Sequence, residues 1–325
     1  MTLYLTQDEV KSILDIESTI EAVEEGFKAM GQGDIEMPPR VYLHFEKYNG
    51  VLIAMPAYLK PVNAAGLKVV TVHPENPVKH KLPAVIARII LNDPEKGEPL
   101  AIMDGTYITA MRTGAAGAVG IKYLARKDAR TAGIIGLGVQ GRSNLRAMCA
   151  VRSIEKVKVF DSAPSASKSF VDEMSRELGI EIEAVGSVAD AAEDSDIIAT
   201  CTPSTKPLLT GEMVSKGTHI SAIGADTASK REIDTSVLKK VDKIVVDFRD
   251  QAFVVGDFSA PLKEGSIRKE NIYAELGEIV TGKKTGRTSE EEITLYKATG
   301  LAIQDVVTAF KVYQIAKRKG IGRDI

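Results

Sequence analysis

Three glycines with the spacing G-x-G-x-x-G carry the clearest chemical signal in this 325-residue sequence. The three, Gly136, Gly138 and Gly141, follow the apolar run Thr131–Ile135 and open a stretch typical of a helix. In a strand–turn–helix unit, such glycines allow a tight turn and a close approach of the backbone to a pyrophosphate. The helix N-terminus then supplies N–H groups and partial positive charge. The pattern predicts a dinucleotide contacted by the turn residues Gly136, Gly138, Val139, Gln140 and Gly141.

Asp161 ends the next apolar run, 20 positions after Gly141. A carboxylate at this point of a dinucleotide-binding unit accepts hydrogen bonds from the ribose hydroxyls and repels a 2′-phosphate. No arginine directly follows Asp161, so the sequence favours NAD over NADP as the cofactor. The competing interpretations, a glycine-rich turn without a ligand and a capping aspartate, fit the strand and helix context less well.

Ligands of such sheets lie at the carboxyl ends of the strands. Two predicted strands end in Thr200–Pro203 and Ile223–Asp226, so we predict cofactor contacts from Thr202, Ile223, Gly224 and Ala225. Asp226 follows these residues and could exchange a proton with a substrate, although a plain turn aspartate is an open alternative. Cys201 has no histidine near it in the sequence and is interpreted as a packing residue.

Three cationic residues in the first part of the chain could hold a substrate carboxylate. Arg40 begins a predicted strand, Lys68 interrupts an apolar one, and Arg112 stands at the start of a helix rich in small residues. Arginine binds carboxylates through two parallel hydrogen bonds, as a 2-oxo or 2-imino acid would require. Each of the three could instead face solvent. The four histidines show no metal-binding spacing, and we predict no metal site.

The elements that must position these residues fall into two patterns. Apolar strands alternate with helices from about residue 129 to residue 246, which predicts βαβ units and a parallel sheet. Residues 38–91 contain short strand-like runs, and Asn49-Gly50 predicts a two-residue hairpin within a mostly antiparallel sheet. We expect two helices between Ser289 and Lys319, separated at Gly300, with Ser289 and Glu292 forming a capping box.

Composition excludes several classes of protein. The 42 Lys and Arg residues are balanced by 44 Asp and Glu residues, so no excess of positive charge predicts nucleic-acid binding. No apolar run approaches the length of a membrane span. The first residues lack the features of a secretion signal. With only two cysteines, in no C-x-x-C pair, the sequence predicts a protein of the reducing cytoplasm.

Taken together, the chain resembles the ornithine cyclodeaminase/μ-crystallin family, above all its archaeal alanine dehydrogenase branch. The resemblance runs nearly end to end. The segments that carry it are 37–43 (MPPRVYL), 54–57 (AMPA), 66–68 (GLK), 112–116 (RTGAA), 135–138 (IGLG), 202–204 (TPS), 222–226 (AIGAD), 290–294 (EEEIT) and 299–305 (TGLAIQD).

This resemblance implies an α/β fold in which a Rossmann doubly wound parallel sheet, residues 127–298, is inserted in a second α+β domain. That second domain, residues 1–126 plus 299–325, would bind the substrate and form a homodimer. Lys68 and Asp226 would be the acid–base pair, and Arg40, Lys68 and Arg112 would surround the substrate. The resemblance also places further residues near the cofactor, namely Arg112, Thr113, Lys230, Ala298 and Gly300.

The implied activity is that of an NAD-dependent amino-acid oxidoreductase of the alanine dehydrogenase type. The substrate would be a small 2-amino or 2-oxo acid. Ornithine cyclodeaminase and cyclic-imine (pyrroline-2-carboxylate) reductase are the alternatives, and a non-catalytic binding protein like μ-crystallin is a remote one. The cyclodeaminases carry a glutamate, and the alanine dehydrogenase an arginine, where this chain has Ile53. The sequence therefore leaves the choice of amino acid or imine open.

Overall fold

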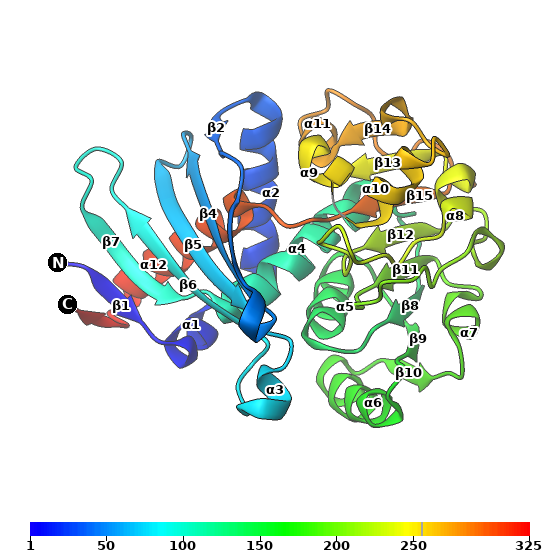
Figure 1. Cartoon of the computed structure of the whole chain (residues 1–325), viewed down its shortest axis with the longest axis horizontal. Coiled ribbons are helices and arrows are strands. Elements are labelled where there is room, and N and C mark those ends of the chain that lie inside the picture. Colours follow the sequence, from blue (N-terminus) through cyan, green and yellow to red (C-terminus); the bar gives the residue numbers. More distant parts are fainter. Residues whose placement is uncertain (255) are drawn as a thin grey trace. The chain divides into compact units, whose positions relative to one another are not determined.

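The computed structural model describes residues 1–254 and 256–325, and the chain divides into two compact units. Unit 1 comprises residues 1–112 and 301–325, and unit 2 comprises residues 113–300 (Figure 1). The first boundary falls inside helix α4 (Thr106–Leu124) rather than at residue 126, where the resemblance placed it. The reason is that the small residues of the second half of α4 pack within unit 2.

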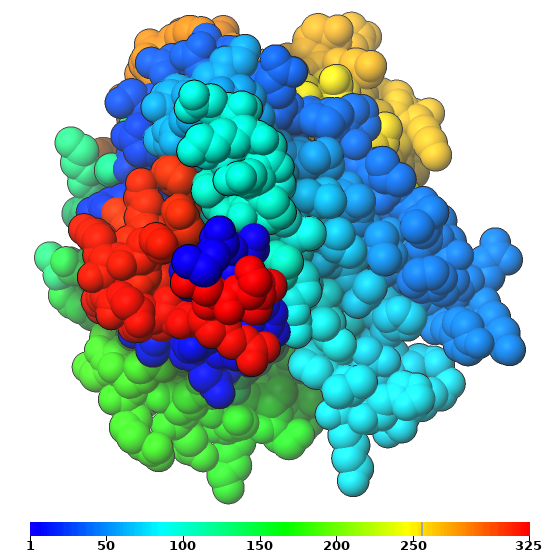
Figure 2. All heavy atoms as spheres, turned by 90° about the vertical axis from the view of Figure 1, so that its left-hand side faces the viewer, coloured from blue at the N-terminus to red at the C-terminus, as the bar shows by residue number. Residues whose placement is uncertain are grey.

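Unit 1 contains one mixed sheet, with strand order β16-β1-β7-β6-β5-β4-β2 and with β3 paired to β4. All pairs are antiparallel except β1 with β7. The two chain termini therefore lie side by side through β1 and β16 (Figure 2). Its strands are β1 (Leu3–Leu5), β2 (Ile35–Glu36), β3 (Val41–Phe45), β4 (Gly50–Leu59), β5 (Ala64–Val72), β6 (Val85–Asn92), β7 (Pro99–Asp104) and β16 (Arg323–Asp324). Its other helices are α1 (Gln7–Ile13), α2 (Ile16–Gln32), α3 (Asn76–Lys79) and α12 (Ala302–Lys319).

One face of this sheet is covered and the other is not. Helix α12 packs against β4, β5 and β6 on one side and against α2 on the other. Because side chains alternate along a strand, Met55, Lys68 and Ile89, which are direct cross-strand neighbours, share a face, and all three are buried. The intervening residues of β4 and β5 are partly exposed.

Unit 2 contains a parallel sheet with strand order β10-β9-β8-β11-β12-β15-β13-β14. Its strands are β8 (Thr131–Ile135), β9 (Lys156–Phe160), β10 (Glu181–Ala184), β11 (Ile197–Thr200), β12 (His219–Ala222), β13 (Lys243–Val246), β14 (Ile272–Glu275) and β15 (Thr294–Lys297). Its helices are α5 (Val139–Val151), α6 (Pro164–Leu178), α7 (Val188–Ala192), α8 (Thr235–Lys240), α9 (Arg249–Val254), α10 (Gly256–Lys263) and α11 (Leu276–Val280). The order reverses between β8 and β11, and the doubly wound α/β fold predicted from the sequence is confirmed.

Glycines in the second half of α4 explain its packing within unit 2. A Cβ atom on Gly114 would lie 2.4 Å from the carbonyl oxygen of Ser143, and one on Gly120 would lie 2.6 Å from the ring of Tyr296. Both distances are shorter than a carbon atom allows. The helix can therefore approach α5 and β15 only where the side chain is a hydrogen atom.

Two of the predicted elements were wrong. Phe45 pairs with Gly50, so the hairpin loop has four residues and contains a 3-10 turn, Glu46–Tyr48, instead of the two-residue turn. The segment expected to be the first of two C-terminal helices contains strand β15, parallel to and between β12 and β13. Its threonine, leucine and tyrosine suit a buried strand better than the helix that the capping pattern suggested.

Within the described part of the chain, no helix is both long enough and apolar enough to cross a membrane. Over the same residues, no group of three or more histidine, cysteine, aspartate or glutamate side chains could hold a metal ion.

Candidate functional site

Unit 1 buries a cluster of charged side chains around Lys68. The Lys68 side chain is 1% exposed, and its Nζ lies 2.7 Å from Oδ2 of Asp305, which is fully buried on α12. The Arg112 guanidinium, 8% exposed, donates from Nε to the other carboxylate oxygen, Oδ1, at 2.9 Å. Its Nη1 donates to Oε1 of Gln304 at 3.0 Å. One carboxylate thus holds a lysine and an arginine together, and the alternative in which Lys68 faces solvent is wrong.

Burial, together with the positive charges of Arg112 and Arg40 and against the opposing effect of Asp305, lowers the pKa of Lys68 from its ordinary value to about 7. Arg40 precedes β3 and is partly buried. A lysine with a pKa near neutrality can donate and accept a proton at physiological pH. The three predicted cations therefore act on one another in the structure.

The cluster has more donors than acceptors. Lys68 and Arg112 share the single carboxylate of Asp305, and the charge of Arg40 also acts on Lys68. Within the described residues, Nε2 of Gln304 is buried and has no hydrogen-bond partner. An unsatisfied buried donor costs about 1–3 kcal/mol. An anion with two acceptor oxygens, such as a carboxylate, would relieve both the excess charge and the unsatisfied donor.

In unit 2, the glycine turn has the form that a pyrophosphate requires. Gly136 has φ +92°, and a Cβ there would meet the carbonyl oxygen of Cys201 at 2.7 Å. A Cβ on Gly141 would lie 2.3 Å from the carbonyl oxygen of Gly136. Gly138, in contrast, faces open space, with nothing within 4 Å of its Cβ position. It is the N-cap of α5 and offers no side-chain cap, so the N–H groups of the first turn are left for an anion.

Asp161 lies beside this turn, at the end of β9. Its Oδ2 accepts from the backbone N–H of Leu137 at 2.9 Å, and its Oδ1 accepts from that of Ala163 at 2.9 Å. Each carboxylate oxygen has a second lone pair, so hydroxyl groups can still bind. Asp161 also lines a cavity of about 590 Å³ at the ends of β9 and β10, together with Lys168 and Asp172. This cavity fits the nucleoside half of a dinucleotide.

Glu232 connects the loops that follow β11 and β12. Its fully buried carboxylate accepts from the backbone N–H of Thr202 at 2.6 Å, of Gly224 at 2.8 Å and of Ala225 at 3.1 Å, and from the hydroxyls of Thr200 and Thr202. Burial raises the pKa of Glu232. This one side chain therefore fixes three of the four predicted cofactor contacts that lie in these loops, and it supports the fourth, Ile223, through its neighbour.

Asp247 fixes the segment that precedes α12. Its Oδ2 accepts from the backbone N–H groups of Thr299 and Gly300 at 2.6 and 2.8 Å. Ala298, the other predicted contact there, is buried. Of the remaining predicted residues of unit 2, Asp226 has a half-exposed carboxylate 2.6 Å from Nζ of Lys230, and Thr113 is buried on α4. Val139 and Gln140 are the first two residues of α5, and Val139 is exposed.

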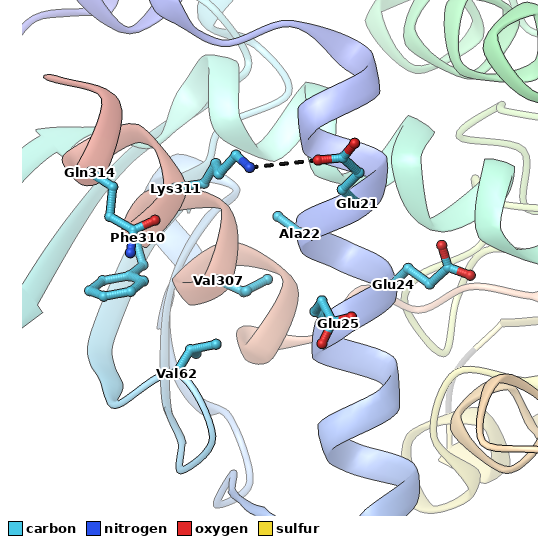
Figure 3. A pocket seen from close by; sticks show the side chains of 9 residues that line it. All are labelled: Glu21, Ala22, Glu24, Glu25, Val62, Val307, Phe310, Lys311 and Gln314. Carbon is cyan, nitrogen blue, oxygen red and sulfur yellow. Dashed lines mark ion pairs between the residues drawn. The ribbon is translucent and has the colours of Figure 1, made fainter. Parts of the chain in front are cut away.

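A separate pocket of about 530 Å³ lies between α2 and α12 in unit 1 (Figure 3). Glu21 and Lys311 face each other across it, with 3.6 Å between their charged groups. None of the predicted site residues lines it. Its size alone does not make it a candidate for the chemistry.

Sequence reasoning gave no role to Gln304, Asp305, Glu232 or Asp247. Asp305 did leave a signal, because a charged residue interrupts the apolar run that becomes the buried side of α12. Glu232 and Asp247 left none, since their roles depend on loops that come together only in the folded sheet.

Residues 1–320 match the sequence model of the ornithine cyclodeaminase/mu-crystallin family. The chain belongs to this family. Among curated relatives, the alanine dehydrogenase of Archaeoglobus fulgidus is 47% identical over 324 residues, which cover 100% of this chain and 98% of that protein.

Two solved structures of family members are similar over their whole length. One is the Thermococcus litoralis Δ1-pyrroline-2-carboxylate reductase in complex with NADH and L-proline, at 44% identity and a TM-score of 0.96, covering 100% of both chains. The other is an archaeal alanine dehydrogenase dimer with bound NAD, at 47% identity and a TM-score of 0.95, covering 100% of this chain and 98% of that one. Both support the resemblance noted from the motifs.

Substitutions in the glycine turn separate folding from binding. Gly138→Ala places a methyl group in open space, so the melting temperature should stay at the wild-type value. The same methyl lies where a pyrophosphate must approach, and the dissociation constant for NADH should rise by tenfold or more, which corresponds to about 1.4 kcal/mol. Fluorescence titration with NADH and thermal unfolding give the two values.

Gly136→Ala is the matched control. Its positive φ and its contact with Cys201 predict a lower melting temperature without any ligand. If Gly138→Ala binds NADH as tightly as the wild type, the turn does not hold the pyrophosphate.

Proposed function

We propose that the protein is an NAD-dependent oxidoreductase that acts on the C–N bond of a small 2-amino acid and of the corresponding 2-imino acid. The observation that carries the proposal is the buried cluster of Lys68, Arg112 and Asp305. A lysine with a pKa near 7 beside an arginine is suited to bind a carboxylate and to exchange a proton. The glycine turn and Asp161 of unit 2 supply the matching dinucleotide site.

In the mechanism that we propose, bound NAD supplies the hydride acceptor and NADH the hydride donor at the Cα atom of the substrate. The guanidinium groups of Arg112 and Arg40 hold the carboxylate and orient Cα. The Lys68 amine removes a proton during oxidation and returns it, as an ammonium, during reduction. Asp226 is the second acid–base group of the proposal. In the dehydrogenase reaction, L-alanine, NAD⁺ and water give pyruvate, ammonium, NADH and a proton.

Two substrates remain in competition. Alanine dehydrogenase activity is our first candidate, supported by the 47% identity to the Archaeoglobus protein. Reduction of Δ1-pyrroline-2-carboxylate is the second, supported by the similarity to the Thermococcus reductase and by Ile53. Ile53 lies on β4, two residues before Met55, and Met55 is the direct cross-strand neighbour of Lys68. Ile53 and Lys68 therefore lie on the same face of the sheet. An apolar side chain there suits an aliphatic or cyclic substrate better than a diamino acid.

Parallel turnover assays test the proposal. NADH oxidation should occur with pyruvate plus ammonia or with Δ1-pyrroline-2-carboxylate, and NADH should support faster turnover than NADPH because Asp161 repels a 2′-phosphate. The positively charged Lys168 lines the same cavity as Asp161 and would attract a 2′-phosphate. The assay with NADPH is therefore a strict test of the effect of Asp161. Activity with ornithine alone would indicate a cyclodeaminase. Binding of NADH without turnover of any substrate would favour a binding protein like μ-crystallin and overturn the proposal.

The pH dependence of kcat/KM reports the charge state of Lys68 in the free enzyme. In the reductive direction the ammonium form is the active one, so kcat/KM should fall as the pH rises through about 7. Lys68→Ala should lower turnover by about 10²–10⁴-fold, and its residual activity should lack this step. Ionisation of the substrate affects kcat/KM of the wild type and of Lys68→Ala equally, so the difference between the two pH profiles reports Lys68. A wild-type profile that is flat between pH 6 and 8, or full activity of Lys68→Ala, would remove Lys68 from the mechanism.

We also propose that the protein forms a homodimer through the uncovered face of the unit 1 sheet. Val41 and Leu43 on β3 are 55% and 54% exposed. They pair with Ala54 and Leu52 on β4, and Val69 on β5 continues the row. A sheet face this apolar needs a cover, and the related alanine dehydrogenase is a dimer.

The two cysteines are free thiols, as we expect of a protein in the cytoplasm.

Light scattering at micromolar concentration should therefore give twice the mass of one chain. Leu43→Glu places a charge on the proposed contact face and should shift the protein to monomer. Val254→Glu is the control, because Val254 is 63% exposed on α9 of unit 2 and so is not part of the unit 1 sheet, and the mass should not change. A monomeric wild type, or a dimer that survives Leu43→Glu, would contradict this interface.

A further inference from the structure

The first turn of helix α12 contains two polar residues within an otherwise apolar run. Gln304 and Asp305 are both fully buried, and their neighbours along the chain are isoleucine and valine. A buried carboxylate stabilises a fold less than apolar residues of the same size would. Its presence therefore calls for a reason beyond packing.

The contacts of Asp305 supply such a reason. Oδ2 is 2.7 Å from Nζ of Lys68 on β5, and Oδ1 accepts from Nε of Arg112 on α4 at 2.9 Å. Gln304, the preceding residue, accepts from Nη1 of the same arginine at 3.0 Å. Two consecutive residues of α12 thus fix the orientation of the guanidinium plane, and one of them also fixes the ammonium.

The charges around Lys68 show what this carboxylate does. Arg112 on α4 and Arg40 before β3 both oppose a charged Lys68, and Asp305 on α12 favours it. Asp305 therefore offsets part of the positive charge of the cluster. The positive charge that remains is available to the carboxylate of a 2-amino or 2-imino acid.

We propose that Asp305 is a positioning residue of the substrate site: its carboxylate holds the Lys68 ammonium and the Arg112 guanidinium side by side and offsets only part of the positive charge, so that a substrate carboxylate can bind there. The inference rests on the proposed function and assigns a role to a residue to which the motif analysis gave none. Asp305 acts through Lys68 and Arg112 and not on the reacting atoms.

The titration of Lys68 tests this role without substrate or cofactor. Lysine labelled with ¹³C at Cε reports its own protonation by NMR, and the Lys68 signal is the one missing in Lys68→Met. In the wild-type protein the midpoint should lie near pH 7. Asp305→Asn keeps the shape and removes the charge, so the midpoint should fall by about one to three pH units. At pH 7.5, kcat/KM of this variant in the reductive direction should fall about eightfold or more and should recover as the pH is lowered.

Asp104→Asn is the matched control in the same unit. Asp104 is 5% exposed, lies 2.7 Å from Nη1 of Arg88 and accepts from the backbone N–H groups of Thr106 and Tyr107 at the start of α4. Its loss should lower the melting temperature and leave the Lys68 midpoint and the pH–rate profile unchanged. A folded Asp305→Asn protein with a wild-type Lys68 midpoint would overturn the proposal.

Asp305→Glu covers the case in which Asp305→Asn does not fold. It keeps the charge on a longer side chain, so the Lys68 midpoint should stay near 7 while kcat/KM falls, because both cations move. A folded Asp305→Glu enzyme with the wild-type kcat/KM would overturn the positioning role. The proposed function fails by a different result, namely a wild-type protein that turns over none of the substrates although its Lys68 titrates as expected.

Discussion

Keeping an ammonium group inside unit 1 is the constraint on which the arrangement of that unit depends. Lys68 is 1% exposed on a central strand, and a buried charge is tolerated only when it is paired. Asp305 supplies the pair from α12, and Arg112 shares it from α4. The carboxylate comes from the C-terminal helix, which packs against the sheet formed by the first hundred residues, although 237 positions separate Lys68 from Asp305 in the sequence. One ion pair thus joins the two separate segments of unit 1 at the proposed substrate site.

Unit 2 also contains buried carboxylates, and two of them fix the backbone of loops. Backbone N–H groups at the carboxyl ends of its strands are fixed by two buried carboxylates, Glu232 and Asp247. The two carboxylates hold the loops in one conformation before a ligand binds, which reduces the entropy lost when the loops become ordered on binding. The glycine turn, in contrast, depends on the absence of side chains. The unit thus combines a turn that leaves room for phosphates with loops that carboxylates hold in place.

Much of this could be read from the sequence, and the rest could not for physical reasons. The glycine turn and Asp161 are local signals, since strand, turn and helix are consecutive, and the structure places them together as the motif required. Strand β15 was missed because a buried parallel strand and a short helix share an apolar pattern. Glu232 and Asp247 were missed because the loops that they fix include Thr202 and Thr299, which are 30 and 52 residues away along the chain. The motif 299–305 suggested Asp305 only as part of a resemblance, and its contact with Lys68 became visible in the fold.

Binding of a planar carboxylate tests the central claim, that the buried cations of unit 1 recognise the substrate through its negative charge. Calorimetric titration of the protein–NADH complex with pyrrole-2-carboxylate, a flat analogue of a cyclic imine, should show binding that is lost in Arg112→Met. The neutral pyrrole-2-carboxamide has nearly the same shape and should bind at least tenfold more weakly, a difference of about 1.4 kcal/mol. Equal affinity for the acid and the amide would contradict the account, because recognition would then depend on shape and not on charge.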